Sequence, residues 1–179
     1  MHRKTRRSFN TPYDAHGLTF STYHRLPVFE KTSHCVLFLE ALESAADKME
    51  FDLWSYVVMP DHIHLLIFPR REVYDMALIL KEIKAPSARA IFACNPELRC
   101  KMLVKRSNGR VEARLWQQGG GYDRNFRSGE DIWEFMEYVH NNPLAAGLCE
   151  RIEDWPWSSA RYYAGEPNKL VVRCPWFSF

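Results

Sequence analysis

Two histidines near the middle of the chain have the side-chain type and the spacing of a metal-ligand pair. His62 and His64 follow Met59-Pro60-Asp61, which separates two apolar runs within residues 54–69. Proline and aspartate between apolar runs predict a β-hairpin. Because side chains alternate along a strand, both imidazoles are expected on one face of the second arm, away from the core. Neutral imidazole binds divalent cations well, so the pair is a candidate metal site, although two solvated histidines would show the same pattern.

A tyrosine and an asparagine one helical turn apart form a second candidate group. Residues from Ser128 predict an amphipathic helix, with Asp131 at a capping position and Val139 closing an apolar stripe. Tyr138 and Asn142 lie outside that stripe, four residues apart, and therefore on one flank of the helix. A tyrosine hydroxyl titrates at about 10, so it attacks a phosphate well only with help, for example from a cation. Packing of the tyrosine, and helix termination by the asparagine, are the alternative interpretations.

Other side chains compete for these roles. Tyr122, after the triple glycine at residues 119–121, is a rival nucleophile, but no candidate ligand accompanies it at a suitable spacing. Asp61 and Asp123 are carboxylates that can assist a cation, and the sequence does not choose between them. His140 falls on the other flank of the helix and is expected to be structural or to face nucleic acid.

Length and composition indicate one globular domain. The chain has 179 residues, of which 46% are hydrophobic and 14% aromatic, enough for a full core. No segment reaches the roughly 18 uncharged apolar residues that a membrane span needs. No apolar stretch follows the basic N-terminus, so a secretory signal is not expected. Five cysteines without a C-x-x-C pair suit reduced thiols, and we expect a cytoplasmic protein.

The formal net charge of +2 hides an uneven distribution. Residues 81–127 carry eleven Lys and Arg against four acids, whereas residues 128–154 carry one Arg against seven acids. A basic block beside a candidate metal site favours a polyanionic ligand, above all nucleic acid, although a solvated basic surface is the simpler alternative. The candidate DNA-contacting residues are Arg3, Lys4, Arg6, Arg7, Lys101, Lys105, Arg106, Arg124 and Arg127.

The first half of the chain must supply the strand that carries the histidines. A strand is expected at residues 18–24, a loop at 25–30 and a helix from Ser33 to about residue 49. The histidine hairpin then occupies residues 52–68.

The second half must supply the helix that carries Tyr138. A helix is expected from Glu72, and Pro86 should either kink it or begin a second helix at 86–94, which Asn95-Pro96 ends. A second hairpin is expected at 101–116, and the last helix should end at Asn142-Pro143. Helices and antiparallel strands in this order predict an α+β domain.

Two ordered motifs resemble those of the REP-associated tyrosine transposases, single-tyrosine relatives of bacterial insertion-sequence transposases within the HUH (His-hydrophobe-His) nuclease superfamily. Residues 58–66 read VMPDHIHLL and residues 138–148 read YVHNNPLAAGL. With further matches near both ends, the resemblance covers about residues 17–163. It implies a ferredoxin-like antiparallel sheet with helices packed on one face. It also divides the chain into a basic arm (1–16), a transposase-like domain (17–163) and a C-terminal tail (164–179).

The resemblance also implies roles for the candidate residues. His62, His64 and Asn142 would hold a divalent cation, Mg²⁺ or Mn²⁺, and Tyr138 would be the nucleophile. Such an enzyme cleaves and transfers single-stranded DNA near hairpins through a 5′-phosphotyrosine intermediate. A DNA-binding protein of the same fold that does not cleave is the alternative, whereas a histidine-triad phosphohydrolase would need a third alternating histidine where Leu66 stands. Related enzymes resemble either dimers that exchange the tyrosine helix or monomers, and the long C-terminal tail favours a monomer.

Overall fold

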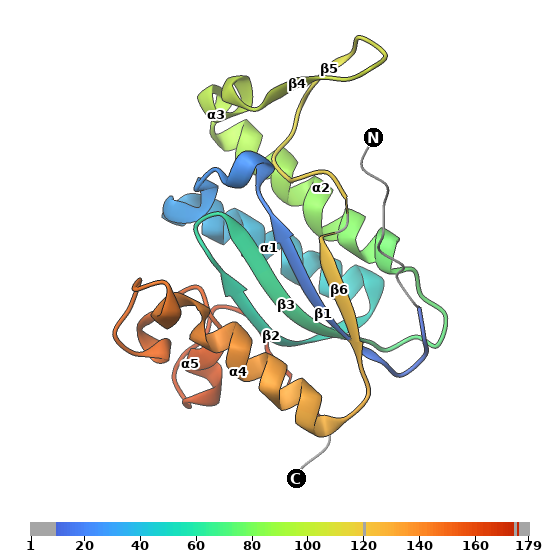
Figure 1. The fold of residues 1–179 in the computed structure, drawn as a ribbon, viewed down its shortest axis with the longest axis vertical. Coiled ribbons are helices and arrows are strands. Elements are labelled where there is room, and N and C mark those ends of the chain that lie inside the picture. The colour runs from blue at the N-terminus through green and yellow to red at the C-terminus, as the bar shows by residue number, and fades with distance from the viewer. Residues whose placement is uncertain (1–9, 120, 174, 176–179) are drawn as a thin grey trace.

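A four-stranded antiparallel sheet forms the centre of the domain (Figure 1). The computed structural model describes residues 10–119, 121–173 and 175. The strands lie in the order β2-β3-β1-β6, with bounds of Ala15–Ser21 (β1), Phe51–Val58 (β2), His62–Pro69 (β3) and Tyr122–Phe126 (β6). Helix α1 (Thr32–Met49) connects β1 to β2, and α2 (Met76–Cys94) follows β3. This β-α-β-β-α-β order in an antiparallel sheet is the ferredoxin-like arrangement, so the predicted α+β fold is confirmed.

Helices α1 and α2 pack on one face of the sheet and enclose the main core (Figure 1). Alternation along β3 turns Ile63, Leu65 and Ile67 toward these helices, and all three side chains are fully buried. They pack with apolar side chains of both helices, among them Phe38 and Ile79. Within the described residues, no helix combines the length and the hydrophobicity that crossing a membrane requires.

Helix α4 (Gly129–Ala145) lies on the opposite face of the sheet (Figure 1). Leu66, which alternates with the core residues of β3, packs with Ile132 and Met136 of α4. The expected single helical face therefore holds for α1 and α2 but not for α4. The reason is that this second sheet face also carries large apolar side chains, such as Trp54 and Phe126, and these need a cover.

Two prolines of the second half of the chain lie inside helices, so the second helix considered at Pro86 and the helix end expected at Asn142-Pro143 are wrong. Helix α2 continues through Pro86 as one helix, and no second helix begins there. Ser87 Oγ bonds the carbonyl of Ile83 at 2.9 Å, and the indole of Trp116 donates to the carbonyl of Lys84 at 2.9 Å, so the carbonyls near the proline have side-chain partners. Helix α4 likewise contains Pro143 and ends at Ala145, three residues beyond the expected end at Asn142.

Strand β6 has no counterpart among the expected elements. Its sequence, YDRNF, is polar, and Phe126 is its one buried apolar side chain. Pairing with β1 at the edge of the sheet makes it a strand, and that interaction is long-range and has no local signal. Near the N-terminus, β1 begins at Ala15, so the sheet starts inside residues 1–16, which were expected to form the basic arm.

A short insertion between α2 and β6 projects from the domain (top of Figure 1). It consists of α3 (Pro96–Lys101), which was not expected, and a two-stranded hairpin of β4 (Leu103–Lys105) and β5 (Val111–Ala113). The expected second hairpin is therefore confirmed, with shorter arms. The loop expected at 25–30 forms two single turns instead, η1 (Tyr23–Arg25) and η2 (Val28–Glu30).

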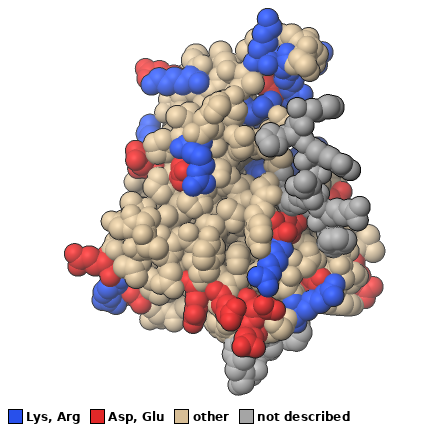
Figure 2. All heavy atoms as spheres, in the orientation of Figure 1, with Lys and Arg blue, Asp and Glu red and all other residues tan. Residues whose placement is uncertain are grey.

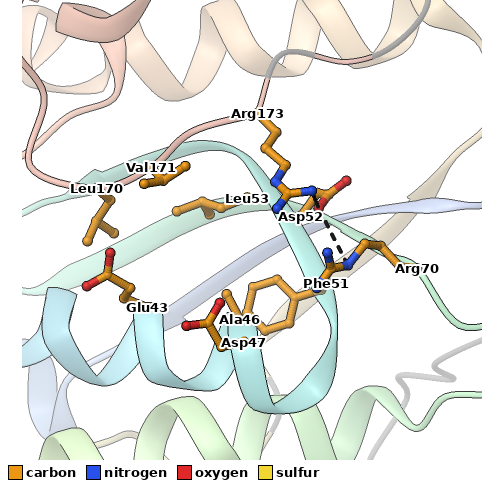
Figure 3. A pocket seen from close by; sticks show the side chains of 10 residues that line it. All are labelled: Glu43, Ala46, Asp47, Phe51, Asp52, Leu53, Arg70, Leu170, Val171 and Arg173. Carbon is orange, nitrogen blue, oxygen red and sulfur yellow. Dashed lines mark ion pairs between the residues drawn. The ribbon is translucent and has the colours of Figure 1, made fainter.

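The chain after α4 covers the free edge of β2. It forms η3 (Ile152–Asp154) and α5 (Ala160–Tyr163), and Val58 N donates to the carbonyl of Trp157 at 2.9 Å. Further on, Arg173 N donates to the carbonyl of Leu53 at 3.0 Å. A pocket of about 250 Å³ lies beside this segment, between the start of β2 and the end of α1, with Asp52, Arg70 and Arg173 on its rim (Figure 3). Covering β2 protects an edge that would otherwise be free to pair with other chains.

Ser159 joins this C-terminal segment to both the sheet and α4. Its hydroxyl oxygen accepts from Tyr56 N at 2.9 Å and lies 2.8 Å from Nε2 of His140, and the side chain is fully buried. Ser159→Ala should therefore lower the free energy of unfolding by about 1–3 kcal/mol, because two buried polar groups lose a partner. Urea unfolding measures this, with the exposed turn residue Ser107→Ala as the control. Equal stabilities of the two variants would contradict the prediction.

Candidate active site

His62 and His64 lie on β3, with their rings on the face of the sheet that α4 covers. The two ring centroids are 4.8 Å apart, at an interplanar angle of 83°. Both rings point away from the main core, as alternation along the strand predicts. His64 is nevertheless buried, with 3% of its surface exposed, because α4 lies over it, whereas His62 is half-buried at the end of the strand.

The ring of His62 is held by a carboxylate. Its Nδ1 lies 2.6 Å from Oδ1 of Asp61, and Oδ2 of Asp61 pairs with Nε of Arg25 at 2.7 Å. A histidine that donates Nδ1–H to a carboxylate presents the lone pair of Nε2, which is how metal-binding histidines are oriented. Asp61, one of the two carboxylates considered from sequence, thus contacts the histidine ring directly.

The ring of His64 is held by a hydroxyl group. Thr19 Oγ1, on the neighbouring strand β1, lies 2.7 Å from Nδ1. Burial lowers the pKa of His64 to about 3, and the charges of His62 and Arg25 act in the same direction. The imidazole is therefore neutral at pH 7. Its Nε2 is buried and makes no hydrogen bond of normal geometry with the described residues, although the Asn142 side chain lies nearby, and this fits a ligand position.

Tyr138 stands beside this ring on α4. The ring centroids of Tyr138 and His64 are 5.3 Å apart, at an interplanar angle of 85°. Val139, the next residue, is fully buried against Val57 and Met59, so it fixes the rotation of the helix at this point. Tyr138 itself is 53% exposed. Its ring thus borders a buried imidazole on one side while solvent reaches the rest of the side chain.

Asn142 lies one helical turn beyond Tyr138. Its Nδ2 donates to the carbonyl of Tyr138 at 2.7 Å, which leaves the amide oxygen as the atom available to a ligand. The Asn142 side chain also makes a polar contact with His64 that raises the pKa of the imidazole, against the stronger effect of burial. Asn142 and the histidine pair therefore share one location.

The donor set fits a divalent cation. It combines two imidazole nitrogens, held through their Nδ1 atoms, with an amide oxygen. In the described part of the chain, no three His, Cys, Asp or Glu side chains are placed so that they could hold a metal ion together, and the amide oxygen of Asn142 is the further donor beside the two imidazoles. Asp123 does not belong to the set. It points to the opposite face of the sheet, where Oδ1 lies 2.8 Å from Nδ1 of the buried His16.

Tyr122, the rival nucleophile, shares the face of the sheet but not the location. It pairs in register with Thr19, which in turn pairs with His64, so two strand spacings separate it from the histidine. That corresponds to roughly 10 Å between backbones. Tyr122 is half exposed at the edge strand. His140 is buried and bonded to Ser159, which agrees with the structural alternative for that residue.

The nine candidate DNA-contacting residues fall into three groups. Arg3, Lys4, Arg6 and Arg7 lie outside the described residues. Lys101, Lys105 and Arg106 belong to the projecting insertion, at the basic top of the surface in Figure 2. Arg124 pairs with Asp131 at 3.1 Å and Arg127 with Asp14 at 3.0 Å, near the acidic start of α4, so these two do not extend the basic insertion.

Two residues of the site were missed by sequence reasoning. Thr19 faces His64 because β1 and β3 are neighbours, a pairing that only the folded sheet reveals. Arg25 reaches Asp61 from a turn that carries no motif. Strand alternation could have placed Thr19 on the correct face, but it could not name the neighbouring strand.

Removing the partner of His64 should weaken metal binding. Thr19→Val keeps the size of the side chain but leaves Nδ1 without a partner, so the affinity for Mn²⁺ should fall about 10- to 100-fold. Isothermal titration of the full chain with Mn²⁺ measures this, and Tyr122→Phe, on the adjacent strand, is the control that should bind as the parent does. Unchanged affinity of Thr19→Val would contradict the proposed ligand role of His64.

Comparison with known proteins agrees with this arrangement. The family of IS200-like transposases matches residues 14–142, from the start of β1 to Asn142. A Haemophilus influenzae protein, which its name assigns to the REP-associated tyrosine transposases, is 25% identical to this chain over 122 residues. The match covers 68% of this chain and 66% of the relative, so it spans just under two thirds of the relative's length. A solved REP-associated tyrosine transposase bound to a REP hairpin has a TM-score of 0.72 at 18% identity, over 98% of this chain and 96% of that one, which shows a shared fold. The resemblance noted in the sequence is confirmed, and the chain belongs to the family of IS200-like transposases.

Proposed function

We propose that this chain cleaves and rejoins single-stranded DNA beside hairpins, through a covalent bond between Tyr138 and a 5′-phosphate. The observation that carries the proposal is the position of Tyr138, whose ring lies 5.3 Å from that of the buried His64. Membership of a transposase family supports DNA as the substrate. The solved relative bound to a REP hairpin supports a hairpin as the feature recognised.

His62, His64 and Asn142 would hold a divalent cation in this proposal. When bound, such a cation polarises the scissile phosphate and neutralises charge that develops on it. Three protein ligands leave coordination positions for phosphate oxygens and water. Mg²⁺ suits phosphoryl transfer, while two imidazole ligands shift the preference toward Mn²⁺.

Tyr138 performs the bond exchange. Its hydroxyl oxygen forms a bond to the scissile phosphorus, and the bond from that phosphorus to the 3′-oxygen breaks. The hydroxyl proton passes to solvent and the departing 3′-oxygen gains one, so the products are a phosphotyrosine at the 5′ end and a free 3′-hydroxyl. One phosphodiester replaces another, so the reverse attack by a 3′-hydroxyl rejoins strands without ATP. About half of the Tyr138 surface is exposed, which supports access of a strand to this residue.

All residues of the proposed active site come from one chain. Tyr138 and Asn142 reach His64 from an α4 that packs on the sheet of the same chain. No helix exchange between two copies is needed to bring these residues together. This geometry supports action as a monomer.

A covalent protein–DNA adduct is the direct test. The full chain, incubated with Mn²⁺ and hairpin DNA that has single-stranded flanks, should give an adduct that survives SDS, and EDTA should prevent it. Tyr138→Phe should lose the adduct while it keeps its DNA affinity, because it lacks only the attacking oxygen. Tyr122→Phe is the matched control and should retain the adduct. An adduct that persists in Tyr138→Phe and disappears in Tyr122→Phe would show that the nucleophile is misassigned.

The basic insertion should provide phosphate contacts outside the active site. Lys101 and Lys105 are exposed, so Lys101→Gln and Lys105→Gln should each weaken hairpin binding and lower the slope of log affinity against log salt by about 1. Fluorescence anisotropy over a salt series measures both quantities. Lys48→Gln, on α1 and paired with Glu82, is the control. Identical slopes for all three variants and the parent would exclude the insertion from the DNA interface.

A further inference from the structure

The turn after β1 has a strained backbone at two successive residues. His24 and Arg25 have φ angles of 55° and 56°, in the left-handed region that residues with a side chain seldom adopt. Neither residue is a glycine, so each carries a side chain in a backbone conformation that disfavours one. Strained backbone of this kind concentrates at functional sites, and here it lies next to the candidate active site.

Arg25 is fixed by two side chains of the site. Its Nε pairs with Oδ2 of Asp61 at 2.7 Å, and its Nη1 donates to Ser21 Oγ at 2.8 Å. Asp61 in turn holds His62, and the charge of Arg25 also acts on the pKa of His64, so the guanidinium lies close to both histidines. The side chain remains 58% exposed, and within the described residues its other N–H groups make no hydrogen bond, so they can donate to a ligand.

The strained turn also lies between the active site and the basic insertion. Tyr23 N donates to the carbonyl of Leu115 at 2.7 Å, at the exit of the β4–β5 hairpin. The guanidinium of Arg114 lies 5.8 Å from the centre of the Tyr23 ring. A nucleic-acid strand that leaves the insertion and enters the active site therefore crosses the turn that presents Arg25.

We propose that Arg25 binds a backbone phosphate of the DNA next to the phosphate that Tyr138 attacks. This rests on the proposed function for the identity of the attacked phosphate. Asp61 and Ser21 orient the plane of the guanidinium, and its remaining N–H groups form a fork that fits two phosphate oxygens. The strained backbone aims the side chain into the path of the strand.

A scan with neutral phosphates tests this contact. The probe is the REP hairpin DNA with single-stranded flanks, in which one linkage at a time is a methylphosphonate, and the protein is the full chain with Tyr138→Phe to prevent cleavage. Neutralising one flank linkage should weaken binding about tenfold. In the Tyr138→Phe protein, the additional change Arg25→Gln should weaken binding to unmodified DNA by a similar factor. Neutralising that linkage should then weaken binding no further. A sensitivity pattern unchanged by Arg25→Gln would overturn the proposal.

Two further variants separate contact from folding. Arg71→Gln removes a guanidinium that is also 58% exposed and also paired with a carboxylate, Glu50, at the far end of β3, and it should bind as the parent does. Arg25→Gly relieves the backbone strain, so it should melt no lower than the parent and still lose the linkage-specific sensitivity. Restored sensitivity in Arg25→Gly would mean that Arg25 acts only on the fold.

The outcomes also separate this inference from the proposed function. If the chain with Tyr138 intact forms no adduct but Arg25→Gln abolishes one linkage-specific contact, the cleavage proposal fails and the phosphate contact stands. If the adduct forms and the sensitivity pattern is the same with and without Arg25, the phosphate contact fails and the cleavage proposal stands.

Discussion

The close contact between α4 and strand β1 determines where Tyr138 lies. A β-carbon at Gly17 would stand 2.8 Å from the ring of Phe135 and 2.5 Å from that of Phe126, so a larger residue there would force both rings to move. With glycine, the ring of Phe135 lies directly on β1. Val139, one turn further on, is then buried against β2, and Tyr138 is left beside His64. The tyrosine is thus positioned by apolar packing, and its side chain makes no hydrogen bond with the described residues.

The polar groups of the site are organised in the opposite way, through hydrogen bonds. Each imidazole contacts a protein group through Nδ1: His62 contacts Asp61, and His64 contacts Thr19. Asn142 donates its amide nitrogen to a carbonyl of its own helix. These contacts keep the other nitrogen or oxygen available to a ligand. Burial keeps His64 neutral, which ligation requires. Burial also makes an Nε2 atom that lacks a hydrogen bond of normal geometry energetically unfavourable. A bound cation would relieve that cost.

The parts of this architecture with local signals could be predicted from sequence. The histidine hairpin, helix α1 and the flank shared by Tyr138 and Asn142 follow from side-chain periodicity and turn residues, and the structure has them. Strand β6 could not be predicted, because its polar sequence becomes a strand only by pairing with β1. The face of the sheet on which α4 packs also could not be predicted. An apolar stripe shows that one side of a helix is buried, but it does not show which part of the protein covers that side. Thr19 and Arg25 were not predicted as site residues for the same reason, because their contacts with His64 and Asp61 join segments that are distant in the chain.

The charges around the site restrict how a nucleic acid can approach it. Glu130, Glu134 and Glu137 occupy the exposed side of α4, and Figure 2 shows acidic side chains in the lower region where α4 lies in Figure 1. Phosphates are therefore repelled from the outer face of the helix that carries Tyr138. The basic insertion lies at the other end of the molecule. A strand that follows favourable charge therefore arrives from the insertion, across the strained turn at Arg25, and meets Tyr138 from the sheet side of α4. Because the two histidines line that same side, the strand would meet Tyr138 and the proposed ligand atoms together, as the proposed attack on a metal-bound phosphate demands.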